Sequence, residues 1–206
     1  MNDGVQQWER AWQALGQPAD PVLRDQLVAR WGEPHRCYHS LHHLHECLDL
    51  FDQVWGLAQR PGEVALALWF HDAFYDPQRS DNEERSAQWA HGSVMRSGLL
   101  PEVADRVHAL VMATRHQAPP EGADTQLLVD VDLAPLGAPD REFDESSAQI
   151  RVEYGHVPEA QYRTGRIGVL QRFLDRPRLY NTAHFYALLE TRARNNLKRE
   201  IASLAG

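Results

Sequence analysis

Cysteine is scarce in this sequence of 206 residues, in which Cys37 and Cys47 are the only two. A secreted scaffold held together by disulfides needs more of them. A separation of ten residues would place the two side chains about 15 Å apart along a helix, so no bridge between them is expected. A chain of this length can bury roughly 70% of the surface that its unfolded form exposes, so it needs no disulfide. These features favour a reducing, cytoplasmic compartment.

Long hydrophobic runs and an excess of positive charge are also missing. No apolar stretch approaches the roughly 18 residues of a transmembrane helix, and the tryptophan-containing start does not resemble a signal peptide. With 21 Lys+Arg against 29 Asp+Glu the net charge is −8, which argues against binding to a nucleic acid polymer or an anionic membrane. The composition is that of a globular protein, and it does not distinguish a monomer from a homodimer.

Apolar residues at helical spacing dominate the chain. Segment 127–133 alternates apolar and acidic residues as a strand would, but no partner strand is evident, so a helix is expected there. Asp20 followed by Pro21 is a typical helix start, and Ser80 or Asp81 is expected to cap a later helix. Predicted helices cover or begin near residues 8–15, 21, 40, 62–70, 80, 101, 127–133, 140–154, 158–174 and 182–204, with 117–125 as a loop. The sequence therefore predicts one all-α domain over residues 1–206.

Histidine is abundant, and five of the 11 histidines fall within residues 35–45. On a helix, His39 and His43 would be neighbours with Cβ atoms about 6 Å apart, so both could act on one target. Taken alone, this block is more typical of a solvated polar face. The histidines become informative only together with the segments that follow.

His71 and Asp72 directly follow the almost wholly apolar segment 62–70. Such a helix is buried on all sides and carries both groups inward, where a carboxylate must be protonated, salt-bridged or bound to a cation. The partial negative charge of a helix C-terminus also favours a cation. The alternative is a capping Asp beside an ordinary ring hydrogen bond.

Asp130 and Asp132 place further carboxylates in an apolar segment. On a helix they lie about 200° apart, so only one of them can face a given site. Imidazoles and carboxylates together form a mixed donor set suited to Mn, Fe, Co, Ni or Zn, with Mg also open. We expect one or two divalent ions.

The order His … His-Asp … Asp resembles the HD superfamily of metal-dependent phosphohydrolases. Tyr38-His39-x-x-x-His43 is also similar to the opening motif of cyclic-nucleotide phosphodiesterases, which share that architecture. The whole chain resembles a bacterial branch of predicted HD phosphohydrolases, with His42 as a departure from its pattern. The similar segments are 36–43, 69–77, 82–87, 127–137, 150–154, 165–166 and 193–197. The resemblance implies an HD-type helical bundle with a metal-site core at about 36–137 and helices 140–204 packed on it.

By this resemblance the metal ligands are His43, His71, Asp72 and Asp132, and Asp72 is also catalytic. His39 would be an acid or a phosphate contact beside them. Glu83 is a candidate for proton transfer. Its neighbour Glu84 could take that role instead, and either could simply pair with the helix dipole.

Two further groups of residues have open interpretations. His116 could hold a second metal ion or cap a helix. Several arginines near the similar segments could bind phosphate through their forked guanidinium groups, although a general preference for arginine over lysine explains them equally well. These are Arg36, Arg79, Arg85, Arg115, Arg151 and Arg166.

The implied activity is hydrolysis of a small phosphorylated metabolite or nucleotide by metal-activated water, as a phosphomonoesterase or a phosphodiesterase. The HD architecture also hosts oxygen chemistry, so a di-iron oxygenase is the second hypothesis. A non-catalytic sensor that binds a metal and a metabolite is the third. The expected partner is a small phosphorylated substrate rather than a nucleic acid polymer or a membrane.

Overall fold

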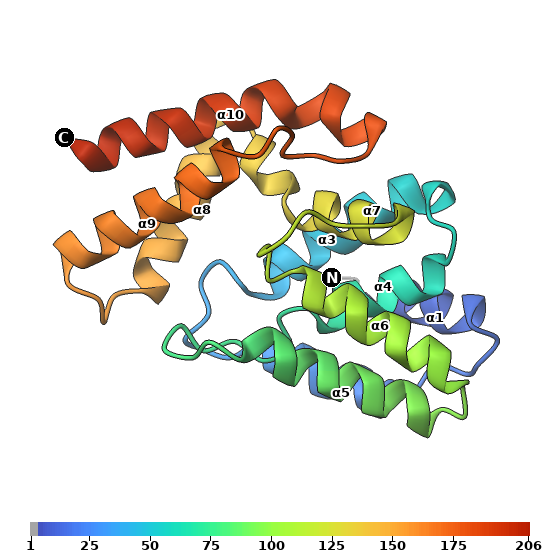
Figure 1. The fold of residues 1–206 in the computed structure, drawn as a ribbon. Coiled ribbons are helices and arrows are strands. Elements are labelled where there is room, and N and C mark those ends of the chain that lie inside the picture. The colour runs from blue at the N-terminus through green and yellow to red at the C-terminus, as the bar shows by residue number, and fades with distance from the viewer. Residues whose placement is uncertain (1–3) are drawn as a thin grey trace. The chain divides into compact units, whose positions relative to one another are not determined.

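The structure is a computed structural model that describes residues 4–206. About 70% of the chain is helical, and residues 4–206 contain no strand, so the prediction of an all-α fold is confirmed (Figure 1). The helices are α1 (Val5–Ala14), α2 (Pro21–Trp31), α3 (Leu41–Val54), α4 (Pro61–Phe70), α5 (Asn82–Arg96), α6 (Pro101–Ala113), α7 (Ala123–Asp132), α8 (Asp140–Glu153), α9 (Glu159–Leu174) and α10 (Ala183–Ala205), with short 3₁₀ turns η1 (Trp55–Leu57) and η2 (Ala134–Gly137).

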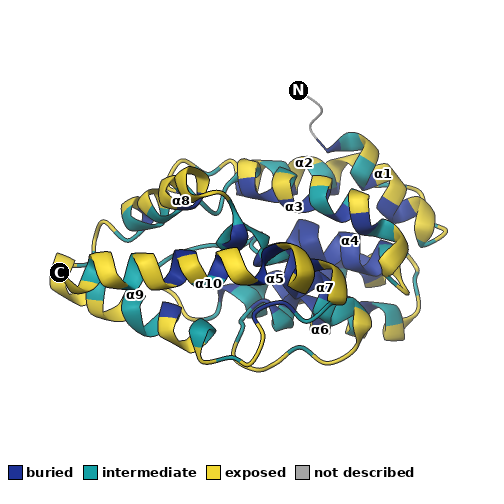
Figure 2. Cartoon of the chain, turned by 90° about the horizontal axis from the view of Figure 1, so that it is seen from above, coloured by how far each residue is buried: buried dark blue, intermediate teal, exposed yellow. Residues whose placement is uncertain are grey.

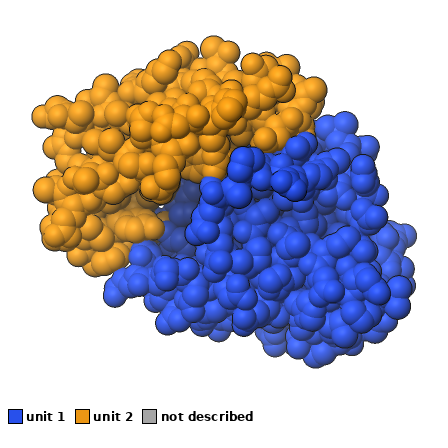
Figure 3. Space-filling view, in the orientation of Figure 1, with its two compact units in different colours: residues 1–131 blue, residues 132–206 orange. Residues whose placement is uncertain are grey.

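The chain divides into two compact units, Met1–Val131 and Asp132–Gly206 (Figure 3). Helices α1 to α6 and all of α7 but its last residue belong to the first unit, and η2 and α8 to α10 belong to the second. The sequence predicted one domain, in which the metal-site core ends near residue 137 and the C-terminal helices start at residue 140. A single domain with its C-terminal helices packed on a metal-site core stays a prediction.

Helix α4 is the centre of the first unit. All of its residues from Gly62 to Phe70 are buried (Figure 2), because it contacts α1, α3, α5 and α6. Gly62 permits the close approach of α1, since a Cβ there would lie 2.9 Å from the carbonyl oxygen of Ala11. An apolar helix surrounded in this way delivers whatever follows Phe70 into the interior.

Tryptophan rings fill the space around α4. Trp8 packs edge-on against Trp12 and Trp69, with ring centroids 5.5 and 5.1 Å away. Trp31 donates its indole N–H to the carbonyl oxygen of Trp69 over 2.9 Å, which ties α2 to the last turn of α4. These contacts hold the C-terminal end of α4 in place.

Of the two helix starts for which a capping residue was predicted, one has the predicted cap and the other does not. Asp20 caps α2 as expected, since its Oδ1 accepts from the backbone N–H groups of Val22 and Leu23 at 2.9 and 3.2 Å. Asp81 precedes α5 without a capping hydrogen bond, because Arg79 donates to both of its carboxylate oxygens at 2.7 Å.

The predicted loop 117–125 is wrong in its last three residues, because α7 begins at Ala123. Asp124 stabilises this early start. Its carboxylate accepts the backbone N–H groups of Gln59 and Arg60 at 2.7 and 3.0 Å. This long-range partnership is invisible in the local sequence.

The second unit satisfies its buried polar groups with its own side chains. Glu190 on α10 accepts from the backbone N–H groups of Leu179 and Tyr180 at 3.0 and 3.1 Å, and from Nε of Arg194 at 2.7 Å. The hydroxyl of Tyr180 donates to the carbonyl oxygen of Leu133. α10 packs on η2 at Gly137, where a Cβ would lie 2.7 Å from that of Leu189.

Two expectations concern membrane-spanning helices and disulfide bonds. Among the described residues, no helix combines the length and the apolar character needed to cross a bilayer. Cys37 and Cys47 form no disulfide.

Candidate metal centre

His43 comes from the buried face of α3, and 2% of its surface is exposed. Its ring stacks on Tyr38 with centroids 5.0 Å apart, and Sγ of Cys47, one turn later, lies 3.7 Å from Nε2. The ring centroid of His71 is 5.4 Å away. His43 therefore faces His71 within the core of the first unit.

His71 directly follows α4 and is 1% exposed. Its Nδ1 lies 2.8 Å from the carbonyl oxygen of Leu68. This contact assigns the ring hydrogen of a neutral imidazole to Nδ1 and leaves the lone pair on Nε2, as in histidines that bind metals. Nε2 in turn lies 3.3 Å from Oδ2 of Asp72. Nε2 and Oδ2 are both acceptors, so this short distance is favourable only when a proton or a cation is shared by the two atoms.

Asp132 completes a group of three potential ligands. One ligand atom from each of His43, His71 and Asp132 lies within 4.8 Å of the other two. Asp132 is the last residue of α7, so this helix positions it. Only one of Asp130 and Asp132 was expected to face a site, and it is Asp132 that lies near the two histidines, whereas Asp130 is fully buried.

The spacing and chemistry of this group fit a divalent ion. Metal–ligand bonds of about 2.0–2.2 Å place two ligands of one ion at most about 4.4 Å apart. A separation within 4.8 Å closes to that value when each side chain shifts by a few tenths of an ångström. Two imidazoles and one carboxylate form the donor set of many transition-metal sites. The three residues could therefore hold a metal ion.

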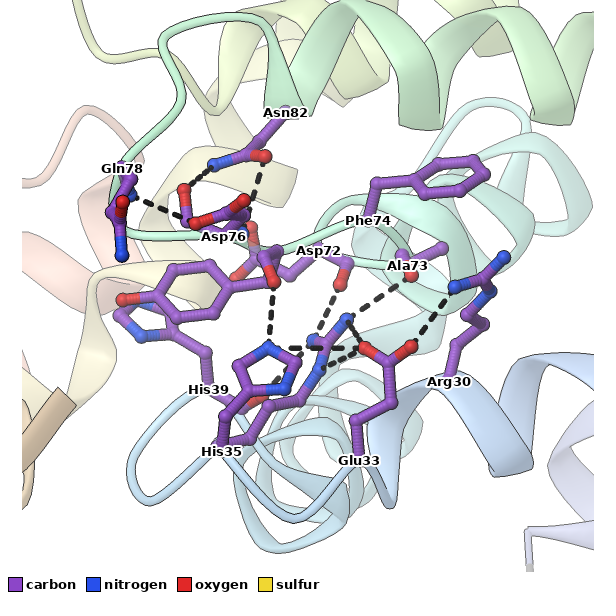
Figure 4. A network of polar contacts seen from close by, with 12 residues as sticks. Arg30, Glu33, His35, His39, Asp72, Ala73, Phe74, Asp76, Gln78 and Asn82 are labelled. Carbon is purple, nitrogen blue, oxygen red and sulfur yellow. Dashed lines mark hydrogen bonds and ion pairs between the residues drawn. The ribbon is translucent and has the colours of Figure 1, made fainter.

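Arg36 connects the segments that carry these ligands, and its partners Glu33, His39, Asp72 and Ala73 are labelled in Figure 4. Its buried guanidinium donates through Nη1 to the carbonyl oxygens of His39 and Asp72 at 3.1 and 2.7 Å, and through Nη2 to that of Ala73 at 3.1 Å. The carboxylate of Glu33 accepts from its Nε and Nη2 at 3.3 Å. Arg36 thereby joins the residues just before α3 to those just after α4.

This role of Arg36 was missed in the sequence, where Arg36 was only one of six candidates for phosphate binding. Its neighbours between α2 and α3 are irregular in structure, so no periodicity marks it as buried. No local signal marks it, because its acceptors on Asp72 and Ala73 lie 36 and 37 positions further along the chain.

His39 lies beside the three potential ligands rather than among them. α3 begins at Leu41, so His39 precedes the helix and the helical spacing assumed for His39 and His43 is wrong. The two ring centroids are nevertheless 6.2 Å apart. The ring of His39 stacks on Tyr75 with centroids 4.1 Å apart, which fixes its orientation.

The other predicted site residues lie outside the group of three. Asp72 contacts His71 through the 3.3 Å approach described above, and its role as a fourth ligand stays a prediction. Glu83, in the first turn of α5, lies 3.7 Å from Nε of Arg115. Glu84 accepts a hydrogen bond from the amide of Gln88.

His42 and His116 are placed differently from His43. The side chain of His42 is 76% exposed and lies 3.4 Å from Glu46, so the neighbouring His43 is the inward-facing histidine of the block. His116 follows α6 with a left-handed backbone, φ 55°, and is not among the residues that converge with His43 and His71.

Most of the arginines proposed for phosphate binding are held by carboxylates instead. Arg79 binds Asp81, Arg151 binds Glu159 and Arg166 binds Glu200 at 2.7 to 3.0 Å. Arg85 differs. In residues 4–206 its guanidinium has no hydrogen bond or ion pair, and it lies over the ring of Phe74 at 4.3 Å.

Comparisons of the chain with models of known families, with curated proteins and with solved structures found no match. The functional argument therefore depends on the residues themselves.

Proposed function

We propose that this chain is an HD-type, metal-dependent phosphohydrolase that acts in the cytoplasm on a small phosphorylated metabolite or nucleotide. The observation that carries the proposal is the convergence of His43, His71 and Asp132 to within 4.8 Å in a largely buried setting. The order of these residues along the chain, with Asp72 beside His71, matches the HD pattern. A divalent ion held by them would supply a Lewis acid that lowers the pKa of water and offsets charge on a phosphate group.

The chain's own residues would prepare this chemistry. The hydrogen bond from His71 Nδ1 to the Leu68 carbonyl oxygen directs Nε2 toward His43 and Asp132. Arg36 limits the movement of both supporting segments, because it is bonded to the backbone of His39 and of Asp72. A rigid arrangement of donors is what a metal centre needs in order to discriminate among ions.

His39 is the proposed proton donor. Hydrolysis breaks a phosphorus–oxygen bond, and the leaving oxygen takes up a proton. An imidazole can supply it because it changes its protonation state near neutral pH. The stacked ring of His39, 6.2 Å from that of His43, lies within reach of a substrate bound at the centre.

The test compares two adjacent histidines. Protein purified without added metal is analysed for its metal content and assayed with an aryl phosphate monoester and a bis-aryl phosphate diester. His43→Ala should lose both bound metal and turnover, whereas the exposed His42→Ala should keep both. Unchanged turnover in His43→Ala would refute the proposal. Two iron atoms per chain with oxygen uptake and no phosphate release would favour the oxygenase, and a bound ligand without turnover would favour the sensor.

A further inference from the structure

A pocket of about 770 Å³ lies between α2 and α5 of the first unit, within the range of about 300–1,000 Å³ typical of sites for small molecules. Arg30 and Gln26 line it from α2, Arg85 and Trp89 from α5, and Phe74 from the segment between α4 and α5. None of His43, His71 and Asp132 lines it. Its function is therefore a question separate from the metal centre.

Positive charge exceeds negative charge in this pocket, on a chain whose net charge is −8. Arg30 and Arg85 contribute two guanidinium groups, and Glu33 is the only acidic residue of the lining. Glu33 is already shared by Arg30, at 2.9 Å, and by the buried Arg36, at 3.3 Å (Figure 4). One carboxylate thus serves two cations, and the charge of Arg85 has no ion-pair partner within residues 4–206.

Both guanidinium groups lie against the ring of Phe74, which holds them in position. Arg85 lies 4.3 Å and Arg30 4.8 Å from the centroid of the Phe74 ring. The Trp89 ring lies 5.5 Å from the same ring, inclined at 55°. Guanidinium groups that are already oriented lose less freedom when they bind an anion, and their forked N–H groups match phosphate oxygens. An indole beside them offers a surface on which a flat ring can stack.

From this combination we infer that the pocket binds an aromatic phosphate of the nucleotide class. The phosphate is held by Arg85 and Arg30, and the base packs against Trp89. Gln26 and Gln88 also line the pocket, and their amide groups can bond to polar atoms of the ligand. The inference does not depend on the proposed hydrolase activity, because no metal ligand takes part.

The experiment uses the full chain after its metal has been removed with EDTA, so that the metal centre cannot contribute. Binding of AMP, adenosine and ribose 5-phosphate is measured by calorimetry. AMP should bind once per chain and at least about tenfold more tightly than either part, a difference of about 1.4 kcal/mol. Equal affinity for AMP and ribose 5-phosphate would overturn the role of the ring. Absence of saturable AMP binding would overturn the site itself.

Variants on one face of α5 provide the control. Arg85→Gln should weaken AMP binding at least about tenfold. Arg96→Gln lies three turns further along the same helix, bonded to Ser93 and outside the pocket, and should bind AMP like the wild type. If Arg85→Gln does not fold, the more exposed Arg30→Gln gives the same test. Wild-type affinity in the arginine variant tested would refute the inference.

Discussion

The two ends of α4 carry ionisable side chains into the same core by different means. Near its start, the buried Glu63 receives two hydrogen bonds from Arg106, at 2.7 and 2.6 Å. These bonds to the Glu63 carboxylate raise the pKa of the Arg106 guanidinium. At its end, His71 faces Asp72, His43 and Asp132. The first end pairs a carboxylate with a cation of the chain, and the second gathers donors that a cation could share.

Arg36 makes the contrast sharper. It brings a positive charge to the C-terminal end of α4, but its hydrogen bonds go to the carbonyl oxygens of Asp72 and Ala73 and to Glu33. The bonds to Asp72 and Ala73 hold the backbone just beyond Phe70, the last residue of the helix. At the start of α4, Arg106 balances the buried charge of Glu63. At the end of α4, the proposed metal ion would balance the charge of Asp132.

The strongest test of this contrast is removal of His71. In His71→Ala the centre loses a donor, so metal affinity should fall by more than about 100-fold, since even residues that only orient a ligand are worth 10–100-fold. Elemental analysis and competitive titration with Co²⁺ measure the effect. Retention of stoichiometric metal would show that His71 is a structural residue like Glu63.

The opposite end should respond in stability rather than in metal binding. Glu63→Gln removes a buried charge that is bonded twice to Arg106, so the free energy of unfolding should fall by about 2 kcal/mol. The loss is no larger because the half-exposed arginine regains water. Urea denaturation measures the loss. Metal content should stay at the wild-type level, and its disappearance would contradict the separation between the two ends.

Arg36 should affect metal binding although it is not a proposed ligand. Arg36→Gln loosens the backbone on each side of the centre, and we expect metal affinity to fall by about tenfold, as for residues that orient ligands. Arg30→Gln is the matched control, because Arg30 binds the same Glu33 and has no hydrogen bond to Asp72 or His39. Equal metal affinity in both variants would limit Arg36 to a role in folding.

The smallest effect is expected at a surface ion pair away from α4. The hydrogen bond from Arg79 lowers the pKa of the Asp81 carboxyl in the folded chain. The carboxylate therefore stabilises the fold above pH of about 4, and this contribution is lost as the pH falls through the lower folded pKa. Asp81→Asn should lose less stability than the wild type between pH 7 and pH 2, as measured by urea unfolding. Identical losses would refute this.

The helices could be predicted because their information is local. Apolar spacing located nearly all of them within a few residues, and Asp20 with Pro21 marked the start of α2. The cap at Asp81 was wrong because Arg79 binds that carboxylate. The start of α7 was wrong because Asp124 binds the distant backbone of Gln59 and Arg60. The inward direction of His71 followed from the apolar character of α4. A helix that is buried on all sides leaves the residue directly after it no route to solvent.

The sequence by itself determined an all-α chain with histidines and carboxylates at the ends of apolar segments, because periodicity and composition decide which faces avoid water. The tertiary structure decided which of those groups meet. It selected His43 over His42 and Asp132 over Asp130, placed His39 before its helix, and assigned Arg36 to backbone carbonyl groups. Such choices depend on contacts between residues far apart in the sequence, such as His71 with Asp132 and Arg36 with Asp72, whose distances no local pattern encodes.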